Sequence, residues 1–278
     1  MRPNRGSPHN EAPNSTGHVR GRPRAQQVLL VARRSVRRTL RQPAQIVPTI
    51  TFPLLLLAVN SSGLGAATRI PGFPTGSYVN FAVTVCFMQG ALFATVAAGT
   101  ELATDIETGF LNRLQLTPLT RGAILGGQLA GATTLALIGA LTYLAVGLAD
   151  GVTIESGVGG ALLLVAFAVF TALAFGGIGV LLAVRSGSAE AVQGLFPLLF
   201  VVFFLSSMNL PRDLISTGWF RTVATWNPVS YLIEAMRSLI ITGWDTTALW
   251  KGAAIGAGIL VVSLGAADRA LRTRMERT

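Results

Sequence analysis

The side chains that most often carry out catalysis or hold metals are almost absent from this sequence. Its two histidines, His9 and His18, fall near the N-terminus, and its single cysteine, Cys86, lies in an apolar run. Metal sites built from histidine and cysteine, and nucleophilic catalysis that relies on a histidine, therefore have no candidates in the rest of the chain. The one lysine, Lys251, follows a tryptophan, so the phosphate-binding loop G-x-x-x-x-G-K-[ST] is also absent. We predict no catalytic site, no metal site and no cofactor bound by this chain.

Polar and charged residues gather instead in a short segment, DIETGFLNRLQLTPLTR, which runs from Asp105 to Arg121 between two long apolar stretches. An ordinary polar loop has no need of several large apolar residues in close succession. If the segment is helical, Phe110, Leu111 and Leu114 share one face, because they are three and four residues apart. The candidate interaction residues here are Glu107, Gly109, Phe110, Leu111, Leu114, Pro118 and Arg121.

A second unusual segment, WNPVSYLIEAMRSLI, precedes the last apolar stretch. Its notable residues are Asn227, Pro228, Tyr231, Glu234 and Arg237. Glu234 and Arg237 are three residues apart, so on a helix they share a face and we expect them to pair.

The composition indicates that these segments belong to a membrane protein. Hydrophobic residues make up 51% of the 278 positions and charged residues only 12%, whereas soluble domains carry about 25% charged residues. Six stretches are apolar and reach or nearly reach the roughly 20 residues that cross a bilayer. They lie at about 44–64, 78–101, 122–148, 158–184, 191–209 and 248–266. We predict an all-α polytopic fold with a transmembrane domain over residues 42–268.

Outside the six spans, we predict the character of four further segments. Residues 1–25 are rich in Pro, Gly, Asn and Arg without periodicity, so we expect a disordered basic tail. Residues 26–41 form an amphipathic basic helix suited to the membrane interface. Residues 210–245, with three of the four tryptophans, are expected to be an external or re-entrant helical segment before span six. A second basic tail covers 269–278.

The distribution of basic residues orients the chain. With six spans, 17 of the 22 Lys and Arg residues fall on the side that holds both termini and the 105–121 segment. The positive-inside rule places that side in the cytoplasm, and it explains the basic N-terminal arm better than nucleic-acid binding does. A bacterial inner membrane fits, with both termini cytoplasmic.

Few polar groups lie within the spans. We interpret Asn80, Thr84, Gln89, Gln128 and Gln193 as interhelical hydrogen-bonding residues, and Glu101 and Asp105 as carboxylates at the membrane interface. Glycines four residues apart, including Gly127 and Gly131, indicate close helix packing.

The two polar segments, in this order on a six-span frame, resemble the permeases of type-2 ABC transporters, which are the membrane subunits of drug, lipid and polysaccharide exporters. The first segment matches the family's acidic residue, glycine, leucine-rich turn, Pro-Leu and basic residue at Glu107, Gly109, Leu111, Leu114, Pro118, Leu119 and Arg121. The second matches its Asn-Pro, aromatic, Glu, Arg pattern at Asn227, Pro228, Tyr231, Glu234 and Arg237. The resemblance covers about 26–270, and in size and layout it is strongest to the actinobacterial drug-resistance permeases.

The resemblance implies that the segment between spans two and three is a cytoplasmic coupling helix that docks on a separate ATP-binding subunit, which binds ATP and Mg. It further implies a second permease copy or a related permease as partner, with a translocation path lined by spans two and five. The apolar, aromatic run at 191–209 favours a hydrophobic or amphipathic substrate. The alternatives are a transporter driven by an ion gradient, and a membrane scaffold or immunity protein that transports nothing.

Overall fold

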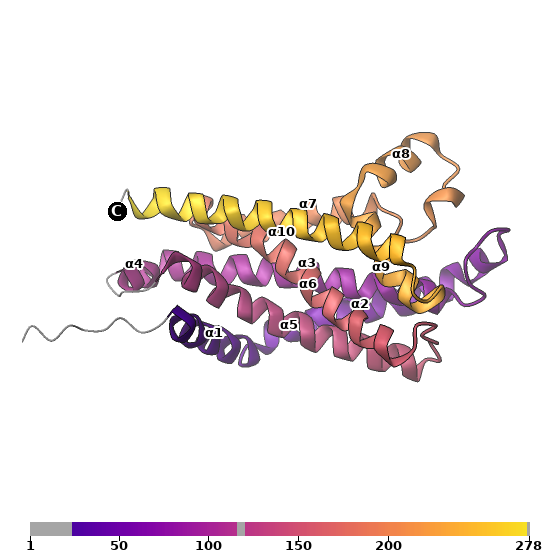
Figure 1. Cartoon of the computed structure of the whole chain (residues 1–278), viewed down its shortest axis with the longest axis horizontal. Helices are drawn as coiled ribbons and strands as arrows, with labels where there is room; N and C mark the ends of the chain where they lie inside the picture. The colour runs from indigo at the N-terminus through magenta and orange to yellow at the C-terminus, as the bar shows by residue number, and fades with distance from the viewer. Residues whose placement is uncertain (1–23, 116–119, 277–278) are drawn as a thin grey trace, which may run out of the picture.

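The chain folds as a bundle of long helices, in agreement with the predicted all-α class (Figure 1). The computed structural model describes residues 24–115 and 120–276, and these residues contain no strand. The predicted disordered tail at 1–25 falls almost entirely outside the described residues.

Five helices are long and apolar enough to cross a membrane. They are α2 (Pro43–Leu64), α3 (Tyr78–Glu107), α5 (Arg121–Ala149), α6 (Gly157–Ser186) and α10 (Thr246–Met275). Four of the six predicted spans match α2, α3, α5 and α6 closely, and α10 begins as predicted for span six but continues to Met275, into the predicted C-terminal tail.

The predicted fifth span is shorter than expected. Helix α7 (Ala189–Phe204) has 16 residues, which is about 24 Å at 1.5 Å per residue and falls short of a full bilayer crossing. The chain leaves the helix at Leu205, where the sequence pattern predicted that the span continues to residue 209.

Shorter helices cover the two ends of the bundle. Helices α1 (Arg24–Leu40) and α4 (Phe110–Gln115) lie at the end that also holds the C-terminus (Figure 1). The opposite end carries the 3-10 turns η1 (Gly65–Arg69) and η2 (Arg212–Leu214), with the helices α8 (Gly218–Trp226) and α9 (Pro228–Ile241). The first helix α1, the C-terminal end of α10 and α4 therefore share one end of the described structure, as the six-span layout requires.

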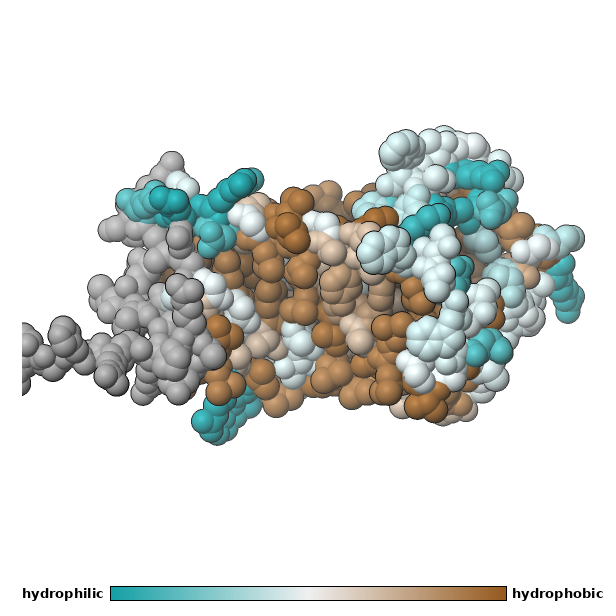
Figure 2. Space-filling model, in the orientation of Figure 1, coloured by the Kyte–Doolittle hydropathy of each residue, from teal (hydrophilic) through white to brown (hydrophobic). Residues whose placement is uncertain are grey.

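Helix α3 is the centre of the bundle. In its most apolar window 83% of the residues are buried, against 11% for α2 and 17% for α10, so the latter two are peripheral. Figure 2 shows an apolar band along the middle of the molecule, with a polar surface at the end that carries α8 and hydrophilic residues beside the grey atoms at the other end, which is the pattern of a membrane-spanning body.

Helix α1 packs against α5 through the predicted glycine pair. A Cβ atom at Gly127 would collide with Val31, and one at Gly131 would collide with Ser35 and Thr39. The buried face of α1 is thus Val31, Ser35 and Thr39, while Leu29 and Leu40 remain exposed. A helix is present at the predicted position, and one face of it is docked on α5.

Candidate functional site

The segment between α3 and α5 turns sharply at Gly109. Its φ of +67° lies in the left-handed region, which costs glycine little, and α4 begins at the next residue. Arg121 is the first residue of α5. Pro118 and the side chains of Leu114 and Arg121 lie outside the described residues, so a predicted helix is present but part of its predicted surface is not described.

Two apolar residues of α4, Phe110 and Leu111, contact the rest of the helical bundle. Leu111 is 1% exposed and belongs to the buried core at this end of the bundle. Phe110 is half-buried, with the guanidinium of Arg34 lying 3.9 Å from its ring centroid. We therefore remove Leu111 from the surface expected to contact a partner. Exposed side chains at this end include Glu107, Thr108 and Arg113.

Glu107 connects the end of α3 to the start of α7. Its Oε1 accepts a hydrogen bond of 2.8 Å from the backbone N–H of Ala189, the first residue of α7. The first N–H groups of a helix have no partner within the helix, and a negative charge there is favourable. This contact links the predicted spans two and five, the two that the family resemblance assigns to the translocation path.

A buried polar cluster joins α1, α3 and α5 just behind α4. Arg34 donates two hydrogen bonds of 2.9 Å to the two carboxylate oxygens of Asp105. Arg38 lies 3.1 Å from the same carboxylate, and Gln128 of α5 donates to it at 2.8 Å. The hydrogen bonds to Asp105 raise the pKa of Arg34 above its ordinary value, because they favour the charged guanidinium.

Glu101 extends this cluster by one helical turn. Its carboxylate accepts a hydrogen bond of 3.1 Å from Ser35 and lies 3.9 Å from Arg38. Glu101 and Asp105 are only 6% and 3% exposed. The interpretation of both as simple interfacial carboxylates is wrong, because each is buried against α1 and contacts an arginine. Gln128 does form an interhelical hydrogen bond, as expected.

At the opposite end, Asn227 joins α7 to α9. Its side-chain amide donates to the carbonyl oxygens of Val202 and Leu205, at 2.6 and 2.9 Å, and so satisfies groups that the end of α7 leaves open. Its side-chain oxygen accepts from the N–H of Val229, which caps α9, and Pro228 occupies the first helical position. The Asn-Pro pair thus holds the C-terminal end of α7 against the start of α9.

Glu234 does not pair with Arg237. It accepts a hydrogen bond of 2.5 Å from Arg212 of η2, whose guanidinium also lies 4.4 Å from the ring centroid of Tyr231. The expected pair fails because an arginine distant in sequence reaches Glu234 from η2, while the Arg237 side chain turns to the interior.

Arg237 is 6% exposed and binds backbone carbonyls. It donates to the carbonyl oxygens of Phe81, Ser207 and Met208 at 3.2, 3.0 and 3.0 Å, and its guanidinium lies 3.5 Å from the Phe81 ring centroid. One arginine of α9 therefore ties the start of α3 to the chain that follows α7.

Sequence reasoning missed Arg34, Ser35, Arg38 and Arg212 as members of these two clusters. It named Glu101, Asp105 and Gln128 but not the arginines that Glu101 and Asp105 contact. A signal was present for part of them. Arg34 and Arg38 are four residues apart, as are Glu101 and Asp105, so each pair projects from one face of its helix. Within the described ranges, no group of three or more His, Cys, Asp or Glu residues is placed to hold a metal ion.

Comparison with known proteins gives a family match that includes segments at both ends of the bundle. Residues 26–241 match the profile of the family described as "ABC-2 type transporter", from α1 through α9. The chain belongs to the ABC-2 type transporter family. The match contains both polar segments, so the resemblance predicted from them is confirmed, and the chain is a multi-pass membrane permease of ABC transporters.

Two similar proteins carry drug-resistance names. The chain is 28% identical over 208 residues to the daunorubicin resistance ABC transporter permease protein DrrB1 of Streptomyces coeruleorubidus, covering 71% of this chain and 69% of that protein. It is 23% identical over 217 residues to the probable doxorubicin resistance ABC transporter permease protein DrrC of Mycobacterium tuberculosis, covering 78% of each.

Proposed function

We propose that this chain is the membrane-spanning subunit of an ABC exporter that moves a hydrophobic or amphipathic compound out of the cell. The observation that carries the proposal is the family match over residues 26–241, which includes every helix from α1 to α9. The export direction and the class of substrate are supported by the names of the two drug-resistance relatives.

The energy comes from a separate ATP-binding subunit, which binds ATP and Mg. This chain has no lysine in a phosphate-binding loop and hydrolyses nothing itself. The partner docks at the end that carries α4, where Glu107 and Arg113 are exposed. Because Glu107 also holds the first residue of α7, a push on this end reaches both α3 and α7.

The same end faces the cytoplasm of a bacterial cell, and the chain resides in the inner membrane. The positive-inside rule supports this orientation, since 17 of the 22 basic residues lie on that side.

An apolar cavity between α2, α3, α5 and α7 is the proposed substrate site. It has a volume of about 400 Å³, which is within the usual range for small-molecule pockets, and it lies in the half of the bundle near the termini. Phe93 and Phe196 line it, with ring centroids 5.2 Å apart. Gln45, Gln193 and Thr100 supply polar groups, and the Thr100 hydroxyl is buried without a hydrogen-bond partner among the described residues.

This lining favours a compound with flat aromatic rings and a few hydroxyl or carbonyl groups. Aromatic side chains stack on planar rings, and the amides and the free hydroxyl supply hydrogen bonds without imposing a charge. Among the residues that the structure describes, no charged side chain lines the cavity. The described lining of the cavity therefore has no cationic side chain to balance the charge of a long anionic sugar chain.

The working complex contains two permeases, either two copies of this chain or one copy and a related permease. Helices α2 and α7 support this arrangement, because they flank the cavity and leave large apolar side chains exposed, including Leu55, Val59, Leu198 and Val201. A second permease on that face would enclose a path between the two subunits.

Doxorubicin efflux by cells that express this chain with its ATP-binding subunit tests the proposal. We expect efflux only when both are present, and we expect Phe196→Ala to reduce it at least fivefold. Leu162→Ala is the control, because Leu162 is a large apolar residue of α6 that is 69% exposed and does not line the cavity. Efflux that needs no ATP-binding subunit would establish the ion-gradient alternative instead. Equal effects of the two substitutions would remove the cavity from the substrate path.

A further inference from the structure

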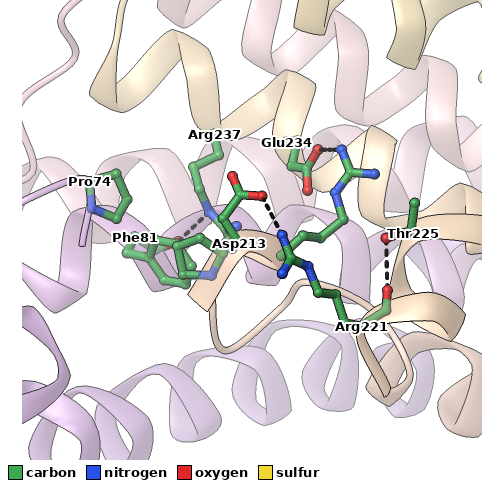
Figure 3. Close-up of a pocket in the computed structure, with 9 residues that line it drawn as sticks. Pro74, Phe81, Asp213, Arg221, Thr225, Glu234 and Arg237 are labelled. Carbon is green, nitrogen blue, oxygen red and sulfur yellow. Dashed lines mark hydrogen bonds and ion pairs between the residues drawn. The ribbon is translucent and has the colours of Figure 1, made fainter. Parts of the chain in front are cut away.

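A second cavity lies at the opposite end of the bundle and has a different character. It measures about 430 Å³ and is bounded by η2, α8, α9 and the start of α3. Figure 3 shows charged side chains from these elements converging on it, with Arg237 and Glu234 from α9, Asp213 from η2 and Arg221 from α8. This cavity belongs neither to the proposed substrate site nor to the surface proposed for the ATP-binding subunit.

The charges that line this cavity do not balance. Arg212 is paired with Glu234 at 2.5 Å and Arg221 with Asp213 at 3.3 Å. The remaining charge, on Arg237, has no carboxylate within ion-pair distance among the described residues, and its bonds go to three neutral backbone carbonyls. One positive charge is left over in a largely buried position, where water screens it poorly.

Arg237 and Arg221 both have N–H groups left that can donate to a ligand. A guanidinium has five N–H groups, and the three backbone contacts of Arg237 leave two of them. Arg221 lines the cavity with a side chain that is 52% exposed, and within the described part of the chain this side chain forms one long hydrogen bond, to Asp213. Two guanidinium groups with spare donors are well suited to an oxyanion.

Exposed tryptophans mark the depth of this cavity. Trp219 and Trp226 of α8 are 66% and 83% exposed, and they flank Arg221 in sequence. Tryptophan collects at the level of lipid headgroups, because its ring is apolar and its N–H is polar. The cavity that Arg221 lines is therefore at the depth where phospholipid phosphates lie.

We propose that this cavity binds a singly charged phosphate group, with Arg237 and Arg221 as its ligands. A phosphodiester of an anionic phospholipid and a free inorganic phosphate share this chemistry, and the depth of the site favours the lipid. The inference goes beyond export, because it concerns the membrane on the far side and does not depend on the ATP-binding subunit. A bound headgroup would hold η2 and α8 against α9.

Lipid retention by the purified chain tests the site. We expect native mass spectrometry, with phosphatidylglycerol and phosphatidylcholine supplied in equal amounts, to show a preference of about tenfold for phosphatidylglycerol. Arg221→Gln should bring the preference close to parity, and Arg221→Lys should restore part of it. Arg69→Gln is the matched control, because Arg69 is exposed at the same end of the bundle and does not line the cavity.

A second measurement separates the two sources of phosphate. We expect sodium phosphate to raise the melting temperature of the delipidated chain no more than sodium chloride of equal ionic strength. If phosphate alone stabilises the wild type but not Arg221→Gln, and no lipid preference exists, the site binds a soluble oxyanion. The proposal is overturned if neither probe shows a preference, or if Arg69→Gln changes lipid retention as much as Arg221→Gln does. The melting temperatures of the variants show whether each one is folded.

Discussion

Arg34 of α1 contacts both oxygens of the Asp105 carboxylate at 2.9 Å, and the same guanidinium covers the ring of Phe110 in α4. One side chain thus connects α1, the central helix α3 and the segment proposed to receive the ATP-binding subunit. A force on α4 therefore reaches α3 through a charged, partly buried contact as well as through the backbone.

Removal of the Asp105 carboxylate should release α1. Asp105→Ala leaves Arg34 and Arg38 without their shared partner, and breaking a buried pair costs about 3–5 kcal/mol. The Arg34 side chain is 38% exposed, so water compensates in part and we expect about 2 kcal/mol. Hydrogen exchange should show faster exchange throughout α1. Asp150→Ala removes an exposed loop carboxylate and is the control. Unchanged protection of α1 in Asp105→Ala would show that packing alone holds this helix.

Substitutions at two neighbouring glycines of α5 should have opposite effects on stability. Gly126→Ala and Gly127→Ala both gain about 1 kcal/mol of helix propensity. A Cβ at Gly126 meets only Val28 at 3.9 Å, whereas one at Gly127 collides with the Cβ of Val31 and forces α1 away. Thermal unfolding in detergent should show Gly126→Ala at or above the wild type and Gly127→Ala at least 1 kcal/mol below it. The same sign for both would mean that α1 does not pack on α5 as described.

Asn227 should not be replaceable by aspartate. Aspartate caps a helix as well as asparagine does, so Asn227→Asp keeps the contact to the N–H of Val229. It loses the amide donor to Val202 and Leu205 and places an acceptor against two carbonyl oxygens. We expect Asn227→Asp to be destabilised by about 2 kcal/mol or more, at least as much as Asn227→Ala. Rescue by aspartate would reduce the role of Asn227 to a helix cap.

Single cysteines should report which end of the bundle faces the cytoplasm. The natural Cys86 is 1% exposed and should not react with a membrane-impermeant maleimide. Cysteines at Ser186 and Arg113 should react only from the cytoplasm, and cysteines at Asp150 and Gly218 only from outside. Labelling of position 218 from the cytoplasm alone would contradict the proposed orientation.

Hydropathy was sufficient to predict the long helices, because α2, α3, α5 and α6 each contain a long, mainly apolar run without a charged residue. It failed for α7, where the predicted span extends to residue 209 but the helix ends at Phe204. The reason is tertiary: the side-chain amide of Asn227 satisfies carbonyls at the end of α7 from a position more than twenty residues away. A pattern of apolar residues cannot predict a contact between residues so far apart in sequence.

The site was predictable in its motifs but not in its contacts. The residues of both polar segments could be selected from their types and spacing. Their partners could not, because Arg212 approaches Glu234 from a separate turn and Arg34 approaches Asp105 from another helix. The spacing of Glu234 and Arg237 predicted that they pair. In the structure Glu234 binds Arg212 instead, and Arg237 binds backbone carbonyls.

The most direct test of the account is ATP-driven transport in proteoliposomes that contain the permease and its ATP-binding subunit. Each preparation should be compared with one in which the phosphate-loop lysine of the ATP-binding subunit is replaced by alanine. The account predicts accumulation of an aromatic drug only with the intact subunit and ATP, and neither hydrolysis nor accumulation with the permease alone. Accumulation that persists with the inactive subunit, or ATP hydrolysis by the permease alone, would contradict it.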